Sequence, residues 1–166
     1  MKPPLFYFSK FNTFDKWVIG LYLVISAGLI YYFVSTDNIE YKRRLMFGYP
    51  LITQLVLYCL LYISLRNLSV FTVWFIIAFS HLVLYYYLME DTTLQMFGGH
   101  PNTSLRNTLP LLMVFQALRI ISLKTQGKEL VGPSRGSTTD IFDEREVTWL
   151  DFVFFFTYLG CMVVFN

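Results

Sequence analysis

The chain has 166 residues, of which 55% are hydrophobic and only 14% are charged, and its mean hydropathy is +0.51. A soluble globular domain typically carries about 25% charged residues, so this chain lacks the polar surface that a water-soluble fold needs. The formal net charge is only +2 and the basic residues are scattered, which argues against a nucleic-acid-binding protein. The composition predicts a single all-α domain embedded in a membrane, with the lipid bilayer covering most of its surface.

The N-terminal segment, residues 1–16, is rich in aromatic and basic residues. Phe8, Phe11 and Phe14 recur every three residues, which predicts a short segment lying in the membrane interface. A flexible leader before the first span is the alternative. The remaining residues, 17–166, are predicted to form one helical membrane domain.

The first predicted span covers residues 17–35, which carry no charge. At 1.5 Å rise per residue a helix of this length reaches about 28 Å, close to the roughly 30 Å thickness of the hydrocarbon layer. Its small residues, Gly20, Ala27 and Gly28, would let another helix approach closely. Residues 36–49 then form a polar connection.

The second predicted span covers residues 50–65. Pro50 suits the first turn of a helix, where its missing N–H leaves no hydrogen bond unmade. Gln54, Tyr58 and Tyr62 follow at intervals of four residues and therefore share one helix face. Because their polar atoms are unfavourable against lipid, we expect this face to point into the protein.

A tight hairpin at residues 66–69 leads into the third predicted span, residues 70–89, with Asn67 or Ser69 as the helix cap. His81 lies in this span. A histidine inside a membrane helix suggests a functional site. No second metal ligand or carboxylate follows it at helical spacing, so a structural hydrogen-bonding role is the favoured interpretation.

Two more apolar segments, residues 108–123 and 149–166, complete a predicted bundle of five transmembrane helices. The first reaches only about 24 Å, and Gln116 and Arg119 share one of its faces. Four spans plus one half-inserted helix is therefore the alternative fold.

Each of these last segments carries one charged residue, Arg119 in the first and Asp151 in the second. In antiparallel helices the two charges would lie about 7 Å and about 4 Å inside the same membrane edge. Pairing would offset the free energy needed to hold a charge near lipid. We therefore expect an interhelical Arg119–Asp151 ion pair, with separate contacts of both charges to lipid headgroups as the alternative.

The longest polar stretch, residues 124–148, is basic in its first half and acidic in its second. Thr139 or Asp140 is a suitable N-cap, which predicts that the last helix begins several residues before Trp149. We expect the loop to dock partner proteins through the charged residues Arg135, Asp140, Asp143, Glu144 and Glu146.

With five spans and a cytoplasmic N-terminus, the inner segments hold eight Lys and Arg residues and the outer loops hold four. The positive-inside rule then predicts a cytoplasmic loop at residues 124–148 and a C-terminus on the opposite face. With four spans the N-terminus moves outward, but the loop and the C-terminus keep their sides. The composition is typical of a bacterial inner membrane protein.

The sequence contains no specific catalytic, metal-binding or cofactor-binding motif, so no cofactor is expected. We expect a non-catalytic membrane subunit that docks larger proteins of a multi-protein complex through its helices and its loop. A small transporter or channel component is the first alternative. The second is an intramembrane enzyme built from His81, His100, Glu90 and Asp91.

Overall fold

The computed structural model describes residues 4–95, 100–132 and 146–165, and within these ranges the chain is helical with no strand. Two short 3₁₀ helices, η1 (Ser64–Arg66) and η2 (Thr92–Leu94), lie in the connections. The five long helices are α1 (Thr13–Ser35), α2 (Ile39–Cys59), α3 (Leu68–Met89), α4 (Thr103–Thr125) and α5 (Trp149–Phe165).

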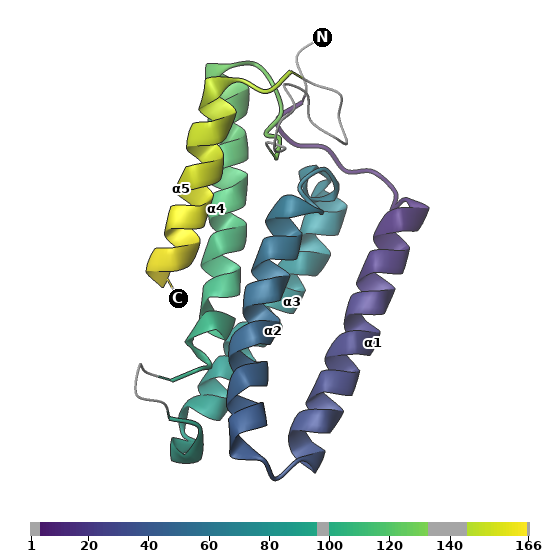
Figure 1. Ribbon diagram of the computed structural model, residues 1–166. Coiled ribbons are helices and arrows are strands. Elements are labelled where there is room, and N and C mark those ends of the chain that lie inside the picture. The colour runs from purple at the N-terminus through teal and green to yellow at the C-terminus, as the bar shows by residue number, and fades with distance from the viewer. Residues whose placement is uncertain (1–3, 96–99, 133–145, 166) are drawn as a thin grey trace.

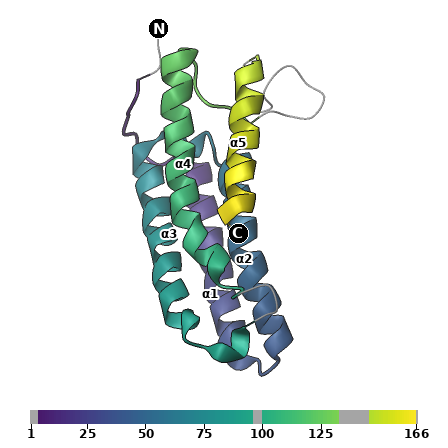
Figure 2. The same ribbon diagram turned by 90° about the vertical axis from the view of Figure 1, so that its left-hand side faces the viewer.

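Consecutive helices run in alternating directions, so the chain forms an up-and-down bundle (Figures 1 and 2). The N-terminal segment, the connection from α2 to α3 and the connection from α4 to α5 all lie at one end, which we call the loop end (Figure 1). Helix α4 packs against α2, α3 and α5, and is therefore the central helix of the bundle.

Three helices, α1, α3 and α4, are long and apolar enough to cross a membrane. Helix α5 is equally apolar but has only 17 residues. Helix α2 differs because its first turns carry Glu40, Lys42, Arg43 and Arg44. The membrane character predicted from composition is therefore borne out for three helices by length and hydropathy.

The predicted boundaries of the second span are wrong. Helix α2 begins at Ile39, where the Asn38 side chain accepts hydrogen bonds from the backbone N–H groups of Glu40 and Tyr41. Pro50 consequently lies inside the helix rather than in its first turn. The charged residues predicted to form a loop instead occupy the first turns of α2, because a good N-cap precedes them.

The start of the last helix also differs from its prediction, since α5 begins at Trp149 and residues 146–148 are not helical. Thr139 and Asp140 lie outside the described residues. The Asp151 carboxylate instead accepts a hydrogen bond of 2.8 Å from the backbone N–H of Thr148. An acidic side chain that reaches back three residues in this way satisfies a free donor at a helix start.

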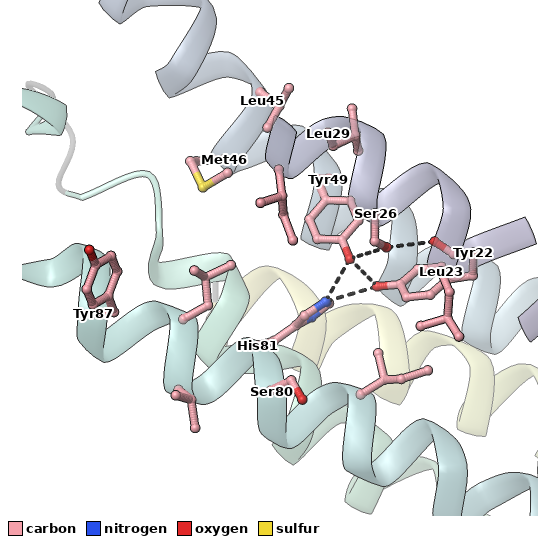
Figure 3. Close-up of a pocket in the computed structure, with 14 residues that line it drawn as sticks. Tyr22, Leu23, Ser26, Leu29, Leu45, Met46, Tyr49, Ser80, His81 and Tyr87 are labelled. Atoms are coloured by element: carbon pink, nitrogen blue, oxygen red, sulfur yellow. Dashed lines mark hydrogen bonds between the residues drawn. The ribbon is translucent and has the colours of Figure 1, made fainter. Parts of the chain in front are cut away.

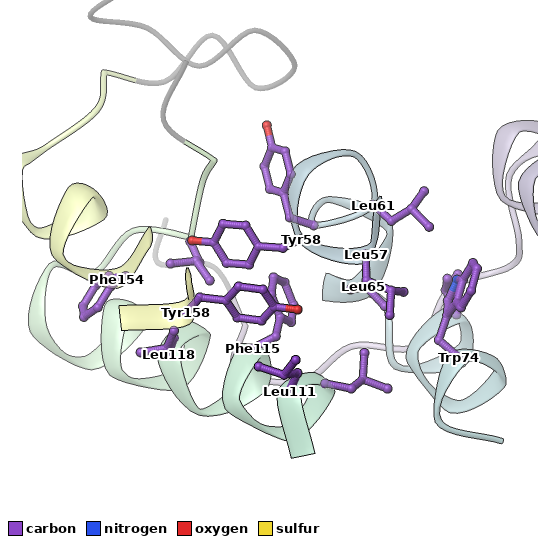
Figure 4. Close-up of a cluster of buried hydrophobic side chains, with 14 of the residues drawn as sticks. Leu57, Tyr58, Leu61, Leu65, Trp74, Leu111, Phe115, Leu118, Phe154 and Tyr158 are labelled. Carbon is purple, nitrogen blue, oxygen red and sulfur yellow. The ribbon is translucent and has the colours of Figure 1, made fainter. Parts of the chain in front are cut away.

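Four of the five helices share one apolar core (Figure 4). The rings of Tyr58 on α2 and Tyr158 on α5 stack with their centroids 4.1 Å apart. Phe115 on α4 meets the Tyr58 ring edge-on at 6.1 Å. Offset and edge-on pairs of this kind add to the stabilisation that burial provides.

Helix α1 is the exception to this packing. Asp15 is its only buried residue, and the side chain of Asn12 caps the helix by accepting from the Asp15 N–H. No atom outside α1 would lie within 4 Å of a Cβ placed on Gly20 or Gly28. The small residues predicted to admit a neighbouring helix therefore face away from the rest of the described chain.

Candidate functional site

A cluster of uncharged polar side chains joins α1 to α2 and α3. The Tyr22 and Tyr49 hydroxyl oxygens lie 2.6 Å apart, and His81 Nε2 lies 2.9 Å from the first and 3.1 Å from the second. Ser26 adds a contact of 2.8 Å to the Tyr49 hydroxyl (Figure 3). We call Tyr22, Ser26, Tyr49 and His81 the hydroxyl–imidazole cluster.

The cluster continues into the bundle through His81, which is 4% exposed. Its other ring nitrogen, Nδ1, lies 3.2 Å from the Thr108 hydroxyl on α4. The Gln54 amide donates to Thr108 at 3.4 Å and to the Ser104 carbonyl oxygen at 2.8 Å. His81 thus bonds to side chains of α1, α2 and α4, a structural connection that agrees with the favoured interpretation of its role.

Two cavities lie beside this cluster. The larger, of about 450 Å³, lies between α1, α2 and α3 and is lined by Tyr22, Tyr49 and His81 among mainly apolar residues (Figure 3). The smaller, of about 310 Å³, is lined by Trp74 and, like the first, by Tyr22 and Tyr49. The two tyrosines therefore border both spaces, and the contact between their hydroxyl groups joins α1 to α2.

A second, charged cluster lies at the loop end. Arg119 is completely buried, and its guanidinium donates two hydrogen bonds, of 2.7 and 2.8 Å, to the two carboxylate oxygens of Glu129. This is the bidentate arrangement in which an arginine–carboxylate pair is strongest. Arg66 joins the cluster, since its Nε lies 3.8 Å from Glu129 and its Nη2 donates to the Leu130 carbonyl oxygen at 2.8 Å.

The N-terminal segment covers this charged cluster. Arg119 Nη1 donates to the Leu5 carbonyl oxygen at 3.1 Å. The centroid of the Tyr7 ring lies 5.9 Å from the guanidinium carbon of Arg119. Burial raises the pKa of the Tyr7 hydroxyl, and the nearby carboxylate of Glu129 raises it further. Asn67 fixes the next part of the segment by bonding to both backbone groups of Ser9.

The expected Arg119–Asp151 ion pair is not formed. Asp151 is buried at the start of α5, where its carboxylate accepts from Thr148 and, at 3.2 Å, from the Gln126 amide. Similar depth along two antiparallel helices does not by itself bring two side chains to the same place. Glu129 pairs with Arg119 instead.

Glu129 and Gln126 are the residues that sequence reasoning missed. Helix α4 ends at Thr125, and Gly127 follows the C-cap residue with a φ of 63°, which glycine readily adopts, before the chain folds back over the bundle. Leu130 and Val131 are almost completely buried there. An apolar pair directly after an acidic residue, within an otherwise polar loop, was the available signal.

The other polar side chains predicted to face inward are buried. Gln54, Tyr58 and Tyr62 have exposed fractions of 0–1%, and Gln116, at 8%, donates a hydrogen bond of 2.8 Å to the Leu65 carbonyl oxygen. These contacts tie helix faces to backbone groups of neighbouring elements. Together with the apolar core, they hold the bundle together.

The structure describes only some residues of the predicted docking loop. Arg135, Asp140, Asp143 and Glu144 lie outside the described residues, whereas Glu146 is described and exposed. The first part of the loop, residues 126–132, packs against the bundle.

The residues of the suggested enzyme site are not brought together. His100 Nε2 lies 3.2 Å from the Asp91 carbonyl oxygen, in the connection between α3 and α4. His81 lies eight residues before the end of α3, which corresponds to about 12 Å along the helix. Among the residues that the structure describes, no three His, Cys, Asp or Glu side chains are close enough to hold a metal ion.

The buried ion pair gives a direct prediction. Replacing Glu129 with Gln leaves the Arg119 charge buried without its counter-charge, which typically lowers the free energy of unfolding by about 3–5 kcal/mol. Glu90→Gln changes an exposed carboxylate at the end of α3 and should alter stability by less than about 0.5 kcal/mol. Denaturant unfolding in detergent measures both, and equal stabilities of the two variants would contradict the assigned pair.

Comparison with known proteins does not identify a family for this chain. It matches no family model, no curated protein and no solved structure. The residues and contacts described above are therefore the basis for the proposed function.

Proposed function

We propose that this protein is a non-catalytic integral membrane subunit, a scaffold that binds other subunits of a membrane complex. The observation that carries the proposal is how the buried polar side chains are used. His81, Arg119 and Asp151 all bond to groups of neighbouring elements within the chain. These bonds connect one element of the chain to another, which is the use of polar side chains that a structural subunit needs.

The exposed surface of α1 supports the binding role. This helix has 23 residues, and only Asp15 is buried within the chain. Its small residues Gly20 and Gly28 have open space beside them. A face of small residues lets a second helix approach closely, so α1 is a suitable contact for a helix of a partner protein.

We further propose that all five helices cross the membrane, and that the membrane is a bacterial inner membrane. The alternating helix directions support five spans, because the N-terminal segment and the α4–α5 connection lie at the same end (Figure 1). By the excess of basic residues, that end is cytoplasmic. The proposal therefore has the loop at residues 124–148 inside the cell and the C-terminus on the opposite face.

Cysteine labelling tests this arrangement. In a background without Cys59 and Cys161, a Ser134→Cys variant should react with a membrane-impermeant maleimide only after the cells are opened. An Asn166→Cys variant should react in intact cells, since it lies on the outer face in the proposed topology. Labelling of Ser134→Cys in intact cells would contradict the proposed sidedness.

Partner recovery tests the docking role. Neutralising Asp140, Asp143, Glu144 and Glu146 together removes the acidic run that we expect to attract basic partners. The inserted amount should stay unchanged, while the larger proteins that co-purify after gentle detergent extraction should fall severalfold.

A matched control neutralises Glu40 and Glu90, which are exposed and lie at the other end of the bundle. This control should leave recovery unchanged. If the wild-type chain co-purifies with no other protein, or if the acidic run makes no difference at moderate salt, the docking role is wrong.

A further inference from the structure

The larger cavity combines an apolar lining with polar atoms gathered at one place. Its volume of about 450 Å³ falls in the range of about 300–1,000 Å³ that is usual for small-molecule sites. Among the described lining residues, the polar side chains are Ser80, Tyr87 and the four members of the hydroxyl–imidazole cluster, and the others are apolar. A few convergent polar groups within an apolar pocket are typical of a ligand site.

The position of the cluster, far from either end of α1, disfavours a charged ligand. Tyr22 lies nine residues inside α1, about 14 Å from its start and thus near the middle of a hydrocarbon layer about 30 Å thick. No Lys, Arg, Asp or Glu lines either cavity. A charged headgroup would have no counter-charge at this depth, so the site suits an uncharged molecule.

The serine and threonine hydroxyls beside the cavities have no proton to offer a ligand. Ser26, Thr53 and Ser80 each donate to the carbonyl oxygen four residues earlier in the same helix, at 2.7, 2.9 and 3.0 Å. Because a hydroxyl has one proton and two lone pairs, each of these oxygens remains available only as an acceptor.

The protons of Tyr22, Tyr49 and His81 are also used within the protein, whichever ring nitrogen of His81 is protonated. Ser26 already donates elsewhere, so Tyr49 is the donor in their 2.8 Å contact. With the proton on Nδ1, His81 donates to Thr108, and Tyr22 donates to Tyr49 across their 2.6 Å contact. With the proton on Nε2, His81 donates to a tyrosine oxygen, and Tyr22 donates to Tyr49.

The hydroxyl–imidazole cluster therefore has no proton left to donate, but the Tyr22 and Tyr49 oxygens, and the Ser80 oxygen beside the cluster, can still accept a hydrogen bond. A ligand head that complements it has to donate a hydrogen bond. A ketone, an ester carbonyl or an ether can only accept, so each would gain nothing from these oxygens. An uncharged hydroxyl group meets both requirements.

The two cavities give such a molecule room for its apolar part. The smaller cavity, of about 310 Å³, is lined without exception by residues of α1, α2 and α3 and shares Tyr22, Leu29 and Tyr49 with the larger one. A flexible chain can occupy either space while its head stays beside the tyrosines. The ring surfaces of Tyr22 and Trp74, which meet edge-on at 4.9 Å, form an apolar wall for the chain.

We propose that the space between α1, α2 and α3 binds a neutral lipid alcohol, a long apolar chain ending in a hydroxyl that donates to the Tyr22 and Tyr49 oxygens. This binding site goes beyond the docking role, because it requires no partner protein. The lipid-binding proposal and the docking proposal are therefore tested by separate experiments, and either one can be wrong without the other.

Trp74 serves as the reporter for a binding test on the full chain in detergent. Trp17→Phe and Trp149→Phe remove the other two tryptophans, both of which are exposed. The probes are a dibrominated octadecanol, its methyl ether and the ketone of equal length, each titrated as a mole fraction of the micelle. We expect the alcohol to half-saturate the quenching of Trp74 at a mole fraction about fivefold lower than the ether or the ketone.

Tyr22→Phe and Tyr49→Phe each remove an acceptor oxygen and should reduce the preference for the alcohol to less than twofold. Tyr31→Phe is the matched control, since Tyr31 lies on the same helix and is 77% exposed. It should keep the fivefold preference, which separates loss of the acceptor from a general effect on α1. Equal quenching by all three probes, or a preference that survives both Tyr22→Phe and Tyr49→Phe, would overturn the proposal.

Discussion

The hydrogen bonds among Tyr22, Tyr49 and His81 are the contact on which the arrangement of α1 depends. Helices α2 to α5 share a continuous apolar core, whereas α1 buries only Asp15. Apolar packing drives helix association weakly in a membrane, because lipid chains are as apolar as the side chains they replace. Interhelical hydrogen bonds, worth about 0.6–2 kcal/mol each, are then comparable in strength with the packing itself. Both cavities lie beside this contact, between α1 and the helices α2 and α3.

The buried polar side chains in the middle of the bundle are uncharged, whereas those at the loop end include charged residues. In the middle, all members of the hydroxyl–imidazole cluster are uncharged, so no counter-ion is needed where no water reaches. At the loop end, Arg119 is charged, and it is compensated by Glu129 and shielded by the backbone around Leu5. The N-terminal segment and the first part of the α4–α5 connection thus act as covers for a buried ion pair. A charge so close to a helix end is tolerated because chain from outside the membrane helices reaches it.

Much of the helical framework could be predicted from the sequence, because hydrophobicity and length are local properties. Helices α1 and α3 closely match the predicted first and third spans, and α4 extends the predicted fourth span to a spanning length. The start of α2 was missed because Asn38 caps a helix whose first turns are charged, and charge was interpreted as a loop signal. The inward position of Gln54, Tyr58 and Tyr62 followed from their spacing alone.

Contacts between distant parts of the chain were harder to predict. The pairing of Arg119 depends on how the chain turns after Gly127, which neither charge nor depth specifies. The partners of His81 lie 59, 32 and 27 residues away, on three different helices. Single-sequence patterns report which face of a helix is polar, but they do not report which faces meet. The hydroxyl–imidazole cluster could therefore be recognised only in three dimensions.

The most direct test of the account measures how firmly the cluster holds α1. Spin labels at Val24 on α1 and Phe79 on α3, both exposed, report the separation of the two helices by double electron–electron resonance in a background without Cys59 and Cys161. We predict one narrow distance distribution for the wild-type cluster and a broader, longer one when Tyr22 and Tyr49 are both replaced by Phe. An unchanged narrow distribution in the double variant would show that packing, and not the hydrogen-bond cluster, positions α1.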